Sequence, residues 1–268
     1  MAATGTSWCS SAWKTAGRTE QMAGYSVFAQ YYDELTANVG YSKRADYLLE
    51  LLARLGHQPG LTLDLACGTG SLTLELFRRG VDVYGVDASV EMLSEAREKC
   101  AEAGADILFL CQRMQDLDLY GTVNTVVCSL DSVNHLPGAE ELEKAFQRVS
   151  FFLEPGGWFL FDANTPYKHE QVLGNHTFVY DMEHVYCVWQ NRFHPGQGRV
   201  DISLDFFQRE GKLYRRSGER FSEWAYPREQ LQAMLEQAGF GAAQFFGELS
   251  FDPPGPESQR WMVAAQKK

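Results

Sequence analysis

The feature that most constrains this chain is an apolar stretch that leads directly into a glycine-containing loop and then into an amphipathic segment. The stretch reads LDLACGTGSLTLEL over residues 63–76. Short apolar runs of this kind are typical of strands buried on both faces of a sheet. Glycines directly after such a strand allow a tight turn and a close approach of the backbone to a ligand. The segment therefore predicts a strand, a ligand-binding loop and a helix in succession.

The alternation of strand and helix continues on both sides of this segment. Helical spacing of apolar residues is expected over residues 41–56, 72–79, 90–104, 139–153 and 228–240. Short apolar strands are expected over residues 61–66, 81–87, 106–111, 124–131, 156–164 and 259–268. Ser71 and Ser89 are expected to cap the helices that follow them, and Gly80 and Gly104 to end those helices. This pattern predicts a parallel sheet covered by helices on both faces.

The pattern changes after Asn175. Residues 177–216 alternate with period two, and turn signals occur at HPGQG and REGK. We expect an antiparallel meander of about three strands, inserted within the α/β layer. Along EHVYCVWQNRFH, before the first of these turns, one strand face carries Tyr186 and Arg192 and the other carries Cys187 and Trp189.

The domain organisation follows from these changes in pattern. Residues 1–21 are rich in small and polar side chains and predict disorder, with Met22 as the hypothetical natural start. The remaining divisions are a helical N-terminal segment over 22–56, a ligand-binding core over 57–175, a β insert over 176–225, and a C-terminal helix with strands over 226–268.

Composition restricts the classes of partner. The net charge of −11 disfavours binding to nucleic acid, which requires clustered Lys and Arg. The six cysteines show neither a CxxC pair nor metal-ligand spacing, so we expect reduced thiols, no metal and a cytoplasmic location. No apolar run approaches the roughly 20 residues that span a bilayer, so no membrane partner is expected. A monomer and a homodimer remain equally open.

The glycine loop differs from a dinucleotide fingerprint at one position. Gly68 and Gly70 match the first two glycines of G-x-G-x-x-G, but the third position is Thr73. Asp87 ends the next strand, where a carboxylate can bind the hydroxyls of a ribose. The pattern therefore favours a ribose ligand over a pyrophosphate, and leaves a nicotinamide-dependent oxidoreductase as an alternative.

Together, LDLACGTG, the acidic residue in GVDASVEML, and the later segments LEPGGWFLFD and LEQAGF resemble class I S-adenosylmethionine-dependent methyltransferases. The resemblance covers roughly residues 25–268. It implies a Rossmann-like, mostly parallel seven-stranded α/β sheet with helices on both faces and an antiparallel last strand. It also implies S-adenosyl-L-methionine as cofactor and in-line methyl transfer to a small-molecule acceptor. A cofactor-binding protein without methyl transfer is a further alternative.

The resemblance also assigns cofactor-binding residues. Asp64 is expected to organise the loop near the methionine amino group, and Asp87 to bind the ribose; capping or turn formation is the structural alternative for both. Aromatic residues of the N-terminal segment are expected to close over the cofactor, or alternatively only to pack its helix. The expected cofactor-binding set is Tyr25, Tyr32, Asp64, Ala66, Gly68, Gly70, Asp87, Met92, Gln112, Arg113, Met114 and Asp131.

The position that commonly reads adenine in this family departs from its pattern. Arg113 occupies the place of the usual carboxylate, and a guanidinium cannot accept the adenine amino proton. Gln112, Asp116 or the backbone around Met114 are the open alternatives for this contact.

Substrate contacts are expected at the ends of the fourth and fifth core strands and in the insert. In SLDSVNHL, His135 is a possible base or a structural residue, and Asn134 a substrate contact. Asn164, Tyr167 and Arg192 complete the expected substrate set. Glu223 receives no role from the sequence.

Overall fold

The computed structural model describes residues 39–268. Its central sheet contains seven strands in the order β10-β11-β5-β4-β1-β2-β3. Their bounds are β1 Thr62–Leu65, β2 Val83–Asp87, β3 Phe109–Cys111, β4 Val123–Cys128, β5 Leu153–Asn164, β10 Gln244–Gly247 and β11 Arg260–Gln266. The pairs from β5 through β3 are parallel, whereas β11 is antiparallel to both β5 and β10. The predicted sheet and its antiparallel last strand are confirmed.

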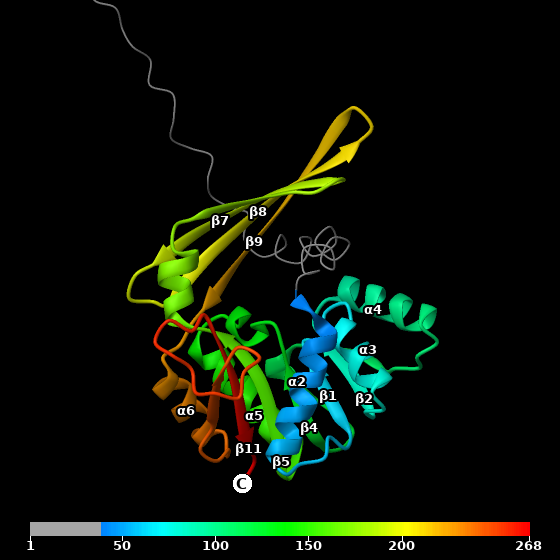
Figure 1. Ribbon diagram of the computed structural model, residues 1–268, viewed down its shortest axis with the longest axis vertical. Coiled ribbons are helices and arrows are strands. Elements are labelled where there is room, and N and C mark those ends of the chain that lie inside the picture. The colour runs from blue at the N-terminus through cyan, green and yellow to red at the C-terminus, as the bar shows by residue number, and fades with distance from the viewer. Residues whose placement is uncertain (1–38) are drawn as a thin grey trace, which may run out of the picture.

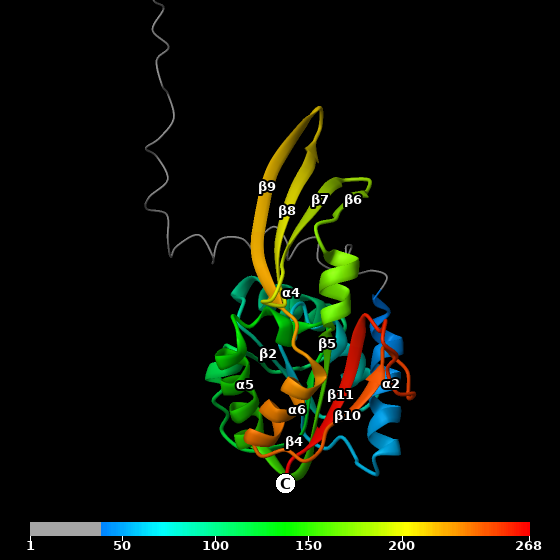
Figure 2. The ribbon, with the colours of Figure 1, turned by 90° about the vertical axis from the view of Figure 1, so that its left-hand side faces the viewer.

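Helices cover both faces of this sheet (Figures 1 and 2). Their bounds are α2 Tyr41–Arg54, α3 Ser71–Arg78, α4 Val90–Glu102, α5 Ala139–Phe152 and α6 Arg228–Gln237. On one face, α5 and α6 pack Phe146 and Leu235 onto the sheet residues Phe159 and Phe161. On the other face, α2 and α3 contribute a second core, which includes Leu48, Leu51, Leu52, Leu72 and Leu76. The periodic leucines of α2 thus bury one face of that helix, as its sequence indicates.

The two predicted serine caps differ in outcome. The Ser89 hydroxyl accepts a hydrogen bond of 3.1 Å from the Met92 N–H and caps α4, as predicted. The cap predicted at Ser71 is wrong, because Gly70 precedes the helix in a left-handed conformation with φ of 71° and Ser71 is already helical. The Ser71 hydroxyl instead accepts a hydrogen bond of 2.6 Å from the Lys99 ammonium.

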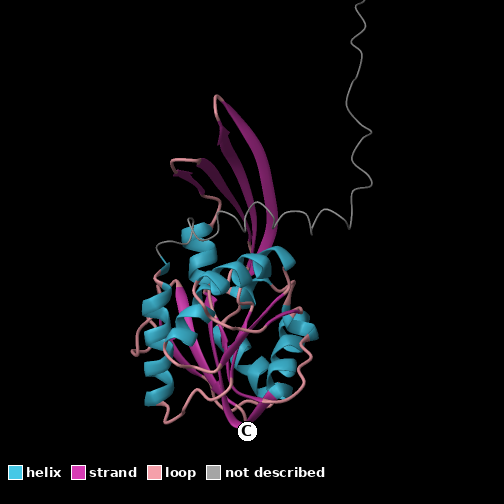
Figure 3. Cartoon of the chain, turned by 90° about the vertical axis from the view of Figure 1, so that its right-hand side faces the viewer, coloured by secondary structure: helices cyan, strands magenta, loops and turns pink. Residues whose placement is uncertain are grey.

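A second, antiparallel sheet projects from the core (Figure 3). Its four strands are β6 Thr177–Asp181, β7 Val185–His194, β8 Arg199–Glu210 and β9 Leu213–Trp224, in sequence order. The meander is confirmed, but it has one strand more than expected. The turn over residues 182–184 was missed because it contains neither glycine nor proline. The predicted alternation along β7 holds, since Cys187 is buried and Tyr186 and Arg192 are exposed.

Three short helical turns connect these layers. They are η2 Met114–Asp116, η3 Ser132–His135, and the π-helical turn η4 Lys168–Leu173, which leads into the projecting sheet. Among residues 39–268, no helix is both long enough and apolar enough to cross a membrane. The predicted disorder of residues 1–21, the start at Met22 and most of the N-terminal helical segment lie outside the described residues.

Candidate functional site

The carboxyl ends of β1, β2, β4 and β5 meet at one edge of the central sheet, because these strands are parallel. The glycine loop follows β1 at this edge. Ala66, Gly68 and Gly70 all have positive φ, of 58°, 55° and 71°. A Cβ on Gly70 would lie 2.9 Å from the Cβ of Ala96 on α4, so this glycine permits close packing of two helices. A positive φ at the non-glycine Ala66 indicates local backbone strain of the kind that concentrates at functional sites.

Asp87 is bonded to this loop. One carboxylate oxygen accepts a hydrogen bond of 2.9 Å from the Gly68 N–H, and the other accepts one of 2.8 Å from the Ser89 N–H. Burial raises the pKa of Asp87, although these backbone donors and the nearby His135 partly oppose that rise. The structure therefore places Asp87 beside the glycine loop, where the sequence predicts a ribose partner.

Asp64 lies beneath the loop and is almost fully buried. Burial raises its pKa to about 7, with Asp87 contributing in the same direction and a hydrogen bond from Thr73 opposing. The Thr73 hydroxyl donates this bond over 2.6 Å. Thr73 occupies the position of the third glycine in a dinucleotide fingerprint, and the structure shows its hydroxyl bound to the loop aspartate. The sequence indicates the position of Thr73 but not this contact.

The three residues expected to read adenine lie together after β3, but two of their side chains already have partners. The Gln112 amide donates to the Asp118 carbonyl over 2.8 Å and accepts from the Asp118 N–H over 2.9 Å. Arg113 is paired with Asp116 through its Nε, at 2.6 Å. Met114 packs against the core. The backbone of this turn is also partly bonded, since the Gln112 N–H donates to the Asp87 carbonyl over 2.9 Å and the Asp116 N–H to the Arg113 carbonyl over 3.0 Å. The group that binds adenine stays a prediction.

The loop after β4 holds the second half of the site. Leu130 and Asp131 both have positive φ, of 59° and 51°. Their backbone N–H groups donate to Asp162, a buried residue of β5, over 2.9 Å and 2.6 Å. Asp162 also accepts a hydrogen bond of 2.8 Å from Arg44 on α2. A buried carboxylate thus stabilises a left-handed turn that non-glycine residues rarely adopt.

Asp131 itself is surrounded by cations. Its carboxylate lies 2.8 Å from the Arg260 guanidinium and accepts a hydrogen bond of 2.6 Å from the Asn164 amide. Burial opposes ionisation of Asp131, but Arg260, Lys168 and His135 outweigh it and lower its pKa. Asp131 is therefore a carboxylate at neutral pH.

Two asparagines join this loop to the projecting sheet. The Asn134 amide donates to the carbonyls of Asn164 and Trp224, over 3.2 Å and 2.8 Å, and accepts from the Asn164 N–H over 2.9 Å. The Asn164 amide donates to both Asp131 and Glu223. These contacts give Asn134 a structural role, which accounts for its burial.

His135 lies beside Glu223, at the base of β9. Its Nε2 is 3.7 Å from Glu223 Oε1, and its ring lies 5.1 Å from that of Phe221. On the other side of the Glu223 carboxylate, His169 Nε2 lies 3.4 Å from Oε2. Glu223 and His169 are buried, whereas 35% of the His135 side chain is exposed. His135 is thus the member of this group that a ligand at the sheet edge can reach.

A ligand atom from each of Asp131, His135 and Glu223 can lie within 4.8 Å of the others, a spacing compatible with a metal ion. Arg260 and Asn164, however, already bind the two Asp131 oxygens. The cationic surroundings of Asp131 therefore favour an organic ligand at this edge over a divalent ion.

The other predicted site residues are placed less centrally. Met92 is buried in α4 behind the Asp87 turn. Tyr167 directly precedes η4 and is half-buried. Arg192 is exposed on β7, opposite Asp201. Tyr25 and Tyr32 lie outside the described residues.

Four residues of the site were not predicted from the sequence: Asp162, His169, Glu223 and Arg260. For Glu223 one feature could have been noticed. Glu223 shares a strand face with Glu219 and Phe221, and in the structure that face turns inward. Asp162 and Arg260 meet because β5 and β11 pair, and no local pattern encodes that pairing.

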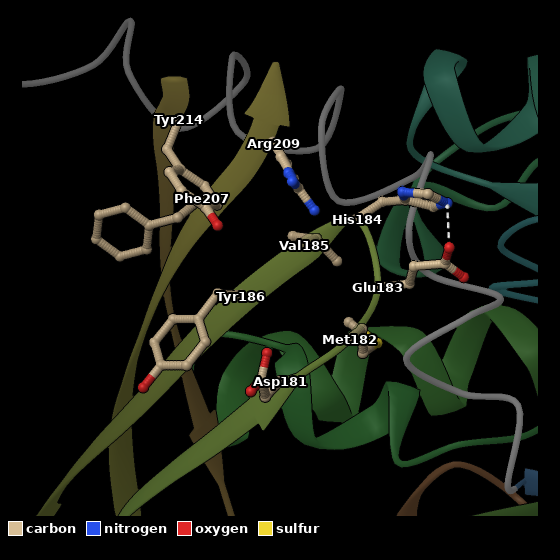
Figure 4. A pocket seen from close by; sticks show the side chains of 9 residues that line it. All are labelled: Asp181, Met182, Glu183, His184, Val185, Tyr186, Phe207, Arg209 and Tyr214. Atoms are coloured by element: carbon tan, nitrogen blue, oxygen red, sulfur yellow. Dashed lines mark ion pairs between the residues drawn. The ribbon is translucent and has the colours of Figure 1, made fainter. Parts of the chain in front are cut away.

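A pocket of about 360 Å³ lies elsewhere, at the far end of the projecting sheet (Figure 4). Asp181, His184 and Tyr186 line it from the β6–β7 hairpin, and Phe207 and Tyr214 from β8 and β9. The opposite end of β9, at Trp224, is the one tied to Asn134. The glycine loop, with its strained backbone and titratable groups, is therefore the stronger candidate site.

Comparison with known proteins agrees with this geometry. A family model described as a methyltransferase domain matches residues 62–157. YqeM of Bacillus subtilis (strain 168), a methyltransferase by name, is 32% identical over 91% of this chain and 97% of its own length.

Solved structures extend the comparison to the fold. A crystal structure of an S-adenosylmethionine-dependent methyltransferase from Clostridium acetobutylicum ATCC 824 has a TM-score of 0.83 at 34% identity, covering 91% of this chain and 98% of its own. The CcbJ methyltransferase from Streptomyces caelestis shares the fold, with a TM-score of 0.76 at 22% identity over 93% and 99% of the two chains. The glycine loop, the strand order and these full-length similarities show that the chain belongs to the class I S-adenosylmethionine-dependent methyltransferases.

Proposed function

We propose that the loop over residues 64–70, together with Asp87, binds S-adenosyl-L-methionine, and that the adjoining loop with His135 receives a small-molecule acceptor. The observation that carries this proposal is the contact of Asp87 with Gly68, which brings a carboxylate to a loop of positive-φ residues. S-adenosylmethionine carries a ribose and a cationic sulfonium but no phosphate. A glycine loop followed by a helix whose third residue, Thr73, replaces the third glycine of the dinucleotide fingerprint fits such a ligand.

Asp64 fits the amino-acid end of the same ligand. Its carboxyl is buried and has a pKa of about 7, so a bound ammonium group nearby would stabilise the ionised form. Asp131, which its cationic neighbours hold ionised, provides a carboxylate at the edge of the sheet.

When bound, S-adenosylmethionine supplies a methyl group on a positively charged sulfur. The acceptor atom attacks the methyl carbon in line with the C–S bond, and the thioether leaves with the electron pair of that bond. The leaving thioether needs no proton, so the protein contributes mainly orientation and exclusion of water. His135, exposed at the edge and close enough to act on the pKa values of Asp87 and Asp131, is placed to take a proton from the acceptor. Asn134, Asn164, Tyr167 and Arg192 remain predicted substrate contacts, although both asparagines are buried and hydrogen-bonded within the protein.

The proposal also covers the cellular location of the protein and its oligomeric state. The described cysteines, Cys67, Cys100, Cys111, Cys128 and Cys187, are all free, which supports the reducing environment of the cytoplasm. We propose a monomer or homodimer that acts on a small molecule and not on nucleic acid. The family assignment overturns the oxidoreductase alternative.

The cofactor proposal is tested by calorimetric titration of the purified protein with S-adenosylmethionine, S-adenosylhomocysteine and NADH. We expect the first two to bind with dissociation constants of order micromolar, about −8 kcal/mol, and NADH to give no heat above dilution. Binding of NADH alone would contradict the proposed ligand. Absence of all three heats in folded protein would contradict a cofactor site at this loop.

Binding of S-adenosylmethionine is also expected to release protons near neutral pH. An ammonium beside Asp64 would lower the pKa of that carboxyl from about 7. At pH values between the pKa of Asp64 in the complex and its pKa in the free protein, the free protein then holds more protons than the complex. Affinity should therefore rise with pH up to about pH 7 and level off above it.

The proton release is measured by titrations at pH 6.5 in buffers that differ in ionisation enthalpy. Asp64→Asn cannot titrate at this position, so it should bind with much less proton exchange and a flatter pH dependence. Equal proton release by Asp64→Asn and by the unaltered protein would assign the effect to another group.

A further inference from the structure

The Glu223 carboxylate lies between two histidines, one buried and one at the ligand edge. Its Oε2 accepts a hydrogen bond of 3.0 Å from the Asn164 amide and lies 3.4 Å from His169 Nε2. Its Oε1 lies 3.7 Å from His135 Nε2. Glu223 is 4% exposed, so these groups take the place of solvent around its charge. A carboxylate buried at this depth requires charged or hydrogen-bonding partners.

The contacts of His169 determine where its protons lie. Its Nδ1 is 3.0 Å from the Gly198 carbonyl oxygen, which can only accept, so Nδ1 carries a hydrogen. Its Nε2 is buried and has no hydrogen-bond partner in the described part of the chain, although it faces a carboxylate oxygen. Two facing acceptors would be unfavourable in such a site, so a proton lies between them.

The Asn164 hydrogen bond indicates which group holds that proton. An amide N–H donates to Oε2, and this favours an ionised Glu223. His169 then carries hydrogens on both nitrogens, and its charge balances the buried carboxylate. The other charged groups near His135 are Asp131 and Asp87, and Asp131 in turn interacts with Lys168 from η4 and Arg260 from β11.

We propose that Glu223, held ionised by His169 and Asn164, is the positioning residue of the methyl-transfer site, and that its oxygen Oε1 orients His135 with a hydrogen on Nε2 and with Nδ1 as the proton acceptor. The present 3.7 Å separation is longer than a hydrogen bond, and catalytic hydrogen bonds commonly shorten when the ligand binds.

This inference rests on the proposed function, because it assigns the route of the proton in methyl transfer. As the acceptor atom bonds to the methyl carbon, the proton on that atom passes to His135 Nδ1. The charge lost from the sulfonium then resides on an imidazolium next to Glu223. Such an arrangement suits an acceptor that must lose a proton, namely a hydroxyl or an amine, over a thioether or a tertiary amine.

The test requires no knowledge of the acceptor. Protein with ¹⁵N-labelled histidine rings is observed by NMR at pH 7. The chain has six histidines, and signals are assigned from single His→Gln variants at His135 and at the four histidines other than His135 and His169. We expect the doubly protonated pattern for His169 and the Nε2–H tautomer for His135. In Glu223→Gln, His169 should become neutral with its hydrogen on Nδ1, and His135 should lose its single tautomer.

Glu219→Gln is the matched control, because Glu219 is a buried glutamate on the same face of β9. It should leave both ring patterns unchanged. A neutral His169 in the unaltered protein, or identical ring patterns in Glu223→Gln, would overturn the proposal. If Glu223→Gln does not fold, the pattern of the unaltered protein decides the matter alone.

Calorimetry separates this inference from the proposed function. Glu223→Gln should bind S-adenosylhomocysteine within about twofold of the unaltered protein, because the substitution lies outside the cofactor loop. Failure of the unaltered protein to bind S-adenosylhomocysteine would contradict the cofactor site while leaving the ring patterns of His135 and His169 interpretable.

Discussion

Asp87→Ala is expected to weaken binding of S-adenosylhomocysteine by about 1 to 3 kcal/mol. The substitution removes a charged acceptor from the ribose hydroxyls and also removes the partners of the Gly68 and Ser89 N–H groups. Burial already raises the pKa of this carboxyl, so the ionised form is costly in the free protein and gains from two hydroxyl donors. Isothermal titration with S-adenosylhomocysteine measures the change directly.

Asp82→Ala is the matched control for this prediction. Asp82 immediately precedes β2 and is exposed, whereas Asp87 ends the same strand at the ligand edge. We expect no change in affinity for Asp82→Ala. An Asp87→Ala protein that folds and binds S-adenosylhomocysteine as tightly as the unaltered chain would show that Asp87 only holds the turn, which is the capping alternative.

The cofactor half of the site could be predicted because its determinants are local. Asp64, Gly68, Gly70 and Asp87 lie within two successive strand–loop–helix units, and hydrophobic periodicity locates both units. Chain geometry then brings the two loops together, since adjacent parallel strands end at the same edge. The structure accordingly bonds Asp87 to Gly68.

The acceptor half could not be predicted in the same way. Glu223 and His169 meet because the final residues of β9 return to the core beside η4. Asp162 meets Arg44 although 118 residues separate the two in the chain. Such contacts depend on tertiary packing and leave no spacing in the sequence. Arg113 received too much weight in the sequence, because it stands where the family commonly has a carboxylate. In the structure its side chain is paired with Asp116 on the surface.

The number of strands in the projecting sheet depended on one turn. Chain reversals at Gly196 and Gly211 were recognised from glycine, which adopts the required positive φ. The turn over residues 182–184 uses ordinary residues, so β6 and β7 appeared as a single alternating run. Period-two alternation identifies strands well but counts them only where the turns have a recognisable sequence.

Asp162→Asn is expected to lower the free energy of unfolding by about 3 to 5 kcal/mol, the usual cost of removing one partner of a buried ion pair. Asp162 is fully buried and accepts hydrogen bonds from Arg44, Arg260 and the backbone of Leu130 and Asp131. Asparagine keeps the volume but removes the charge and one acceptor oxygen. Urea denaturation at pH 7 without ligand measures the loss.

Glu50→Gln is the control on α2, because Glu50 forms an exposed pair with Arg54 at 2.9 Å. Such surface pairs contribute at most about 1 kcal/mol. A loss of that small size in Asp162→Asn would show that solvent or a neighbouring group compensates the buried guanidinium of Arg44.

A double variant identifies the origin of the loss. Arg44→Met removes the cation that Asp162→Asn leaves with only the half-exposed Glu248, at 3.4 Å, as a charge partner. Methionine replaces the buried guanidinium with an apolar side chain. Arg260 still has Asp131 and Glu248 as partners, and Asp131, Asp162 and Glu248 outweigh burial in raising its pKa. We therefore expect the double variant to be more stable than Asp162→Asn alone. If the two losses simply add, the cost instead arises from the left-handed turn at Leu130 and Asp131, whose N–H groups would have lost their acceptor.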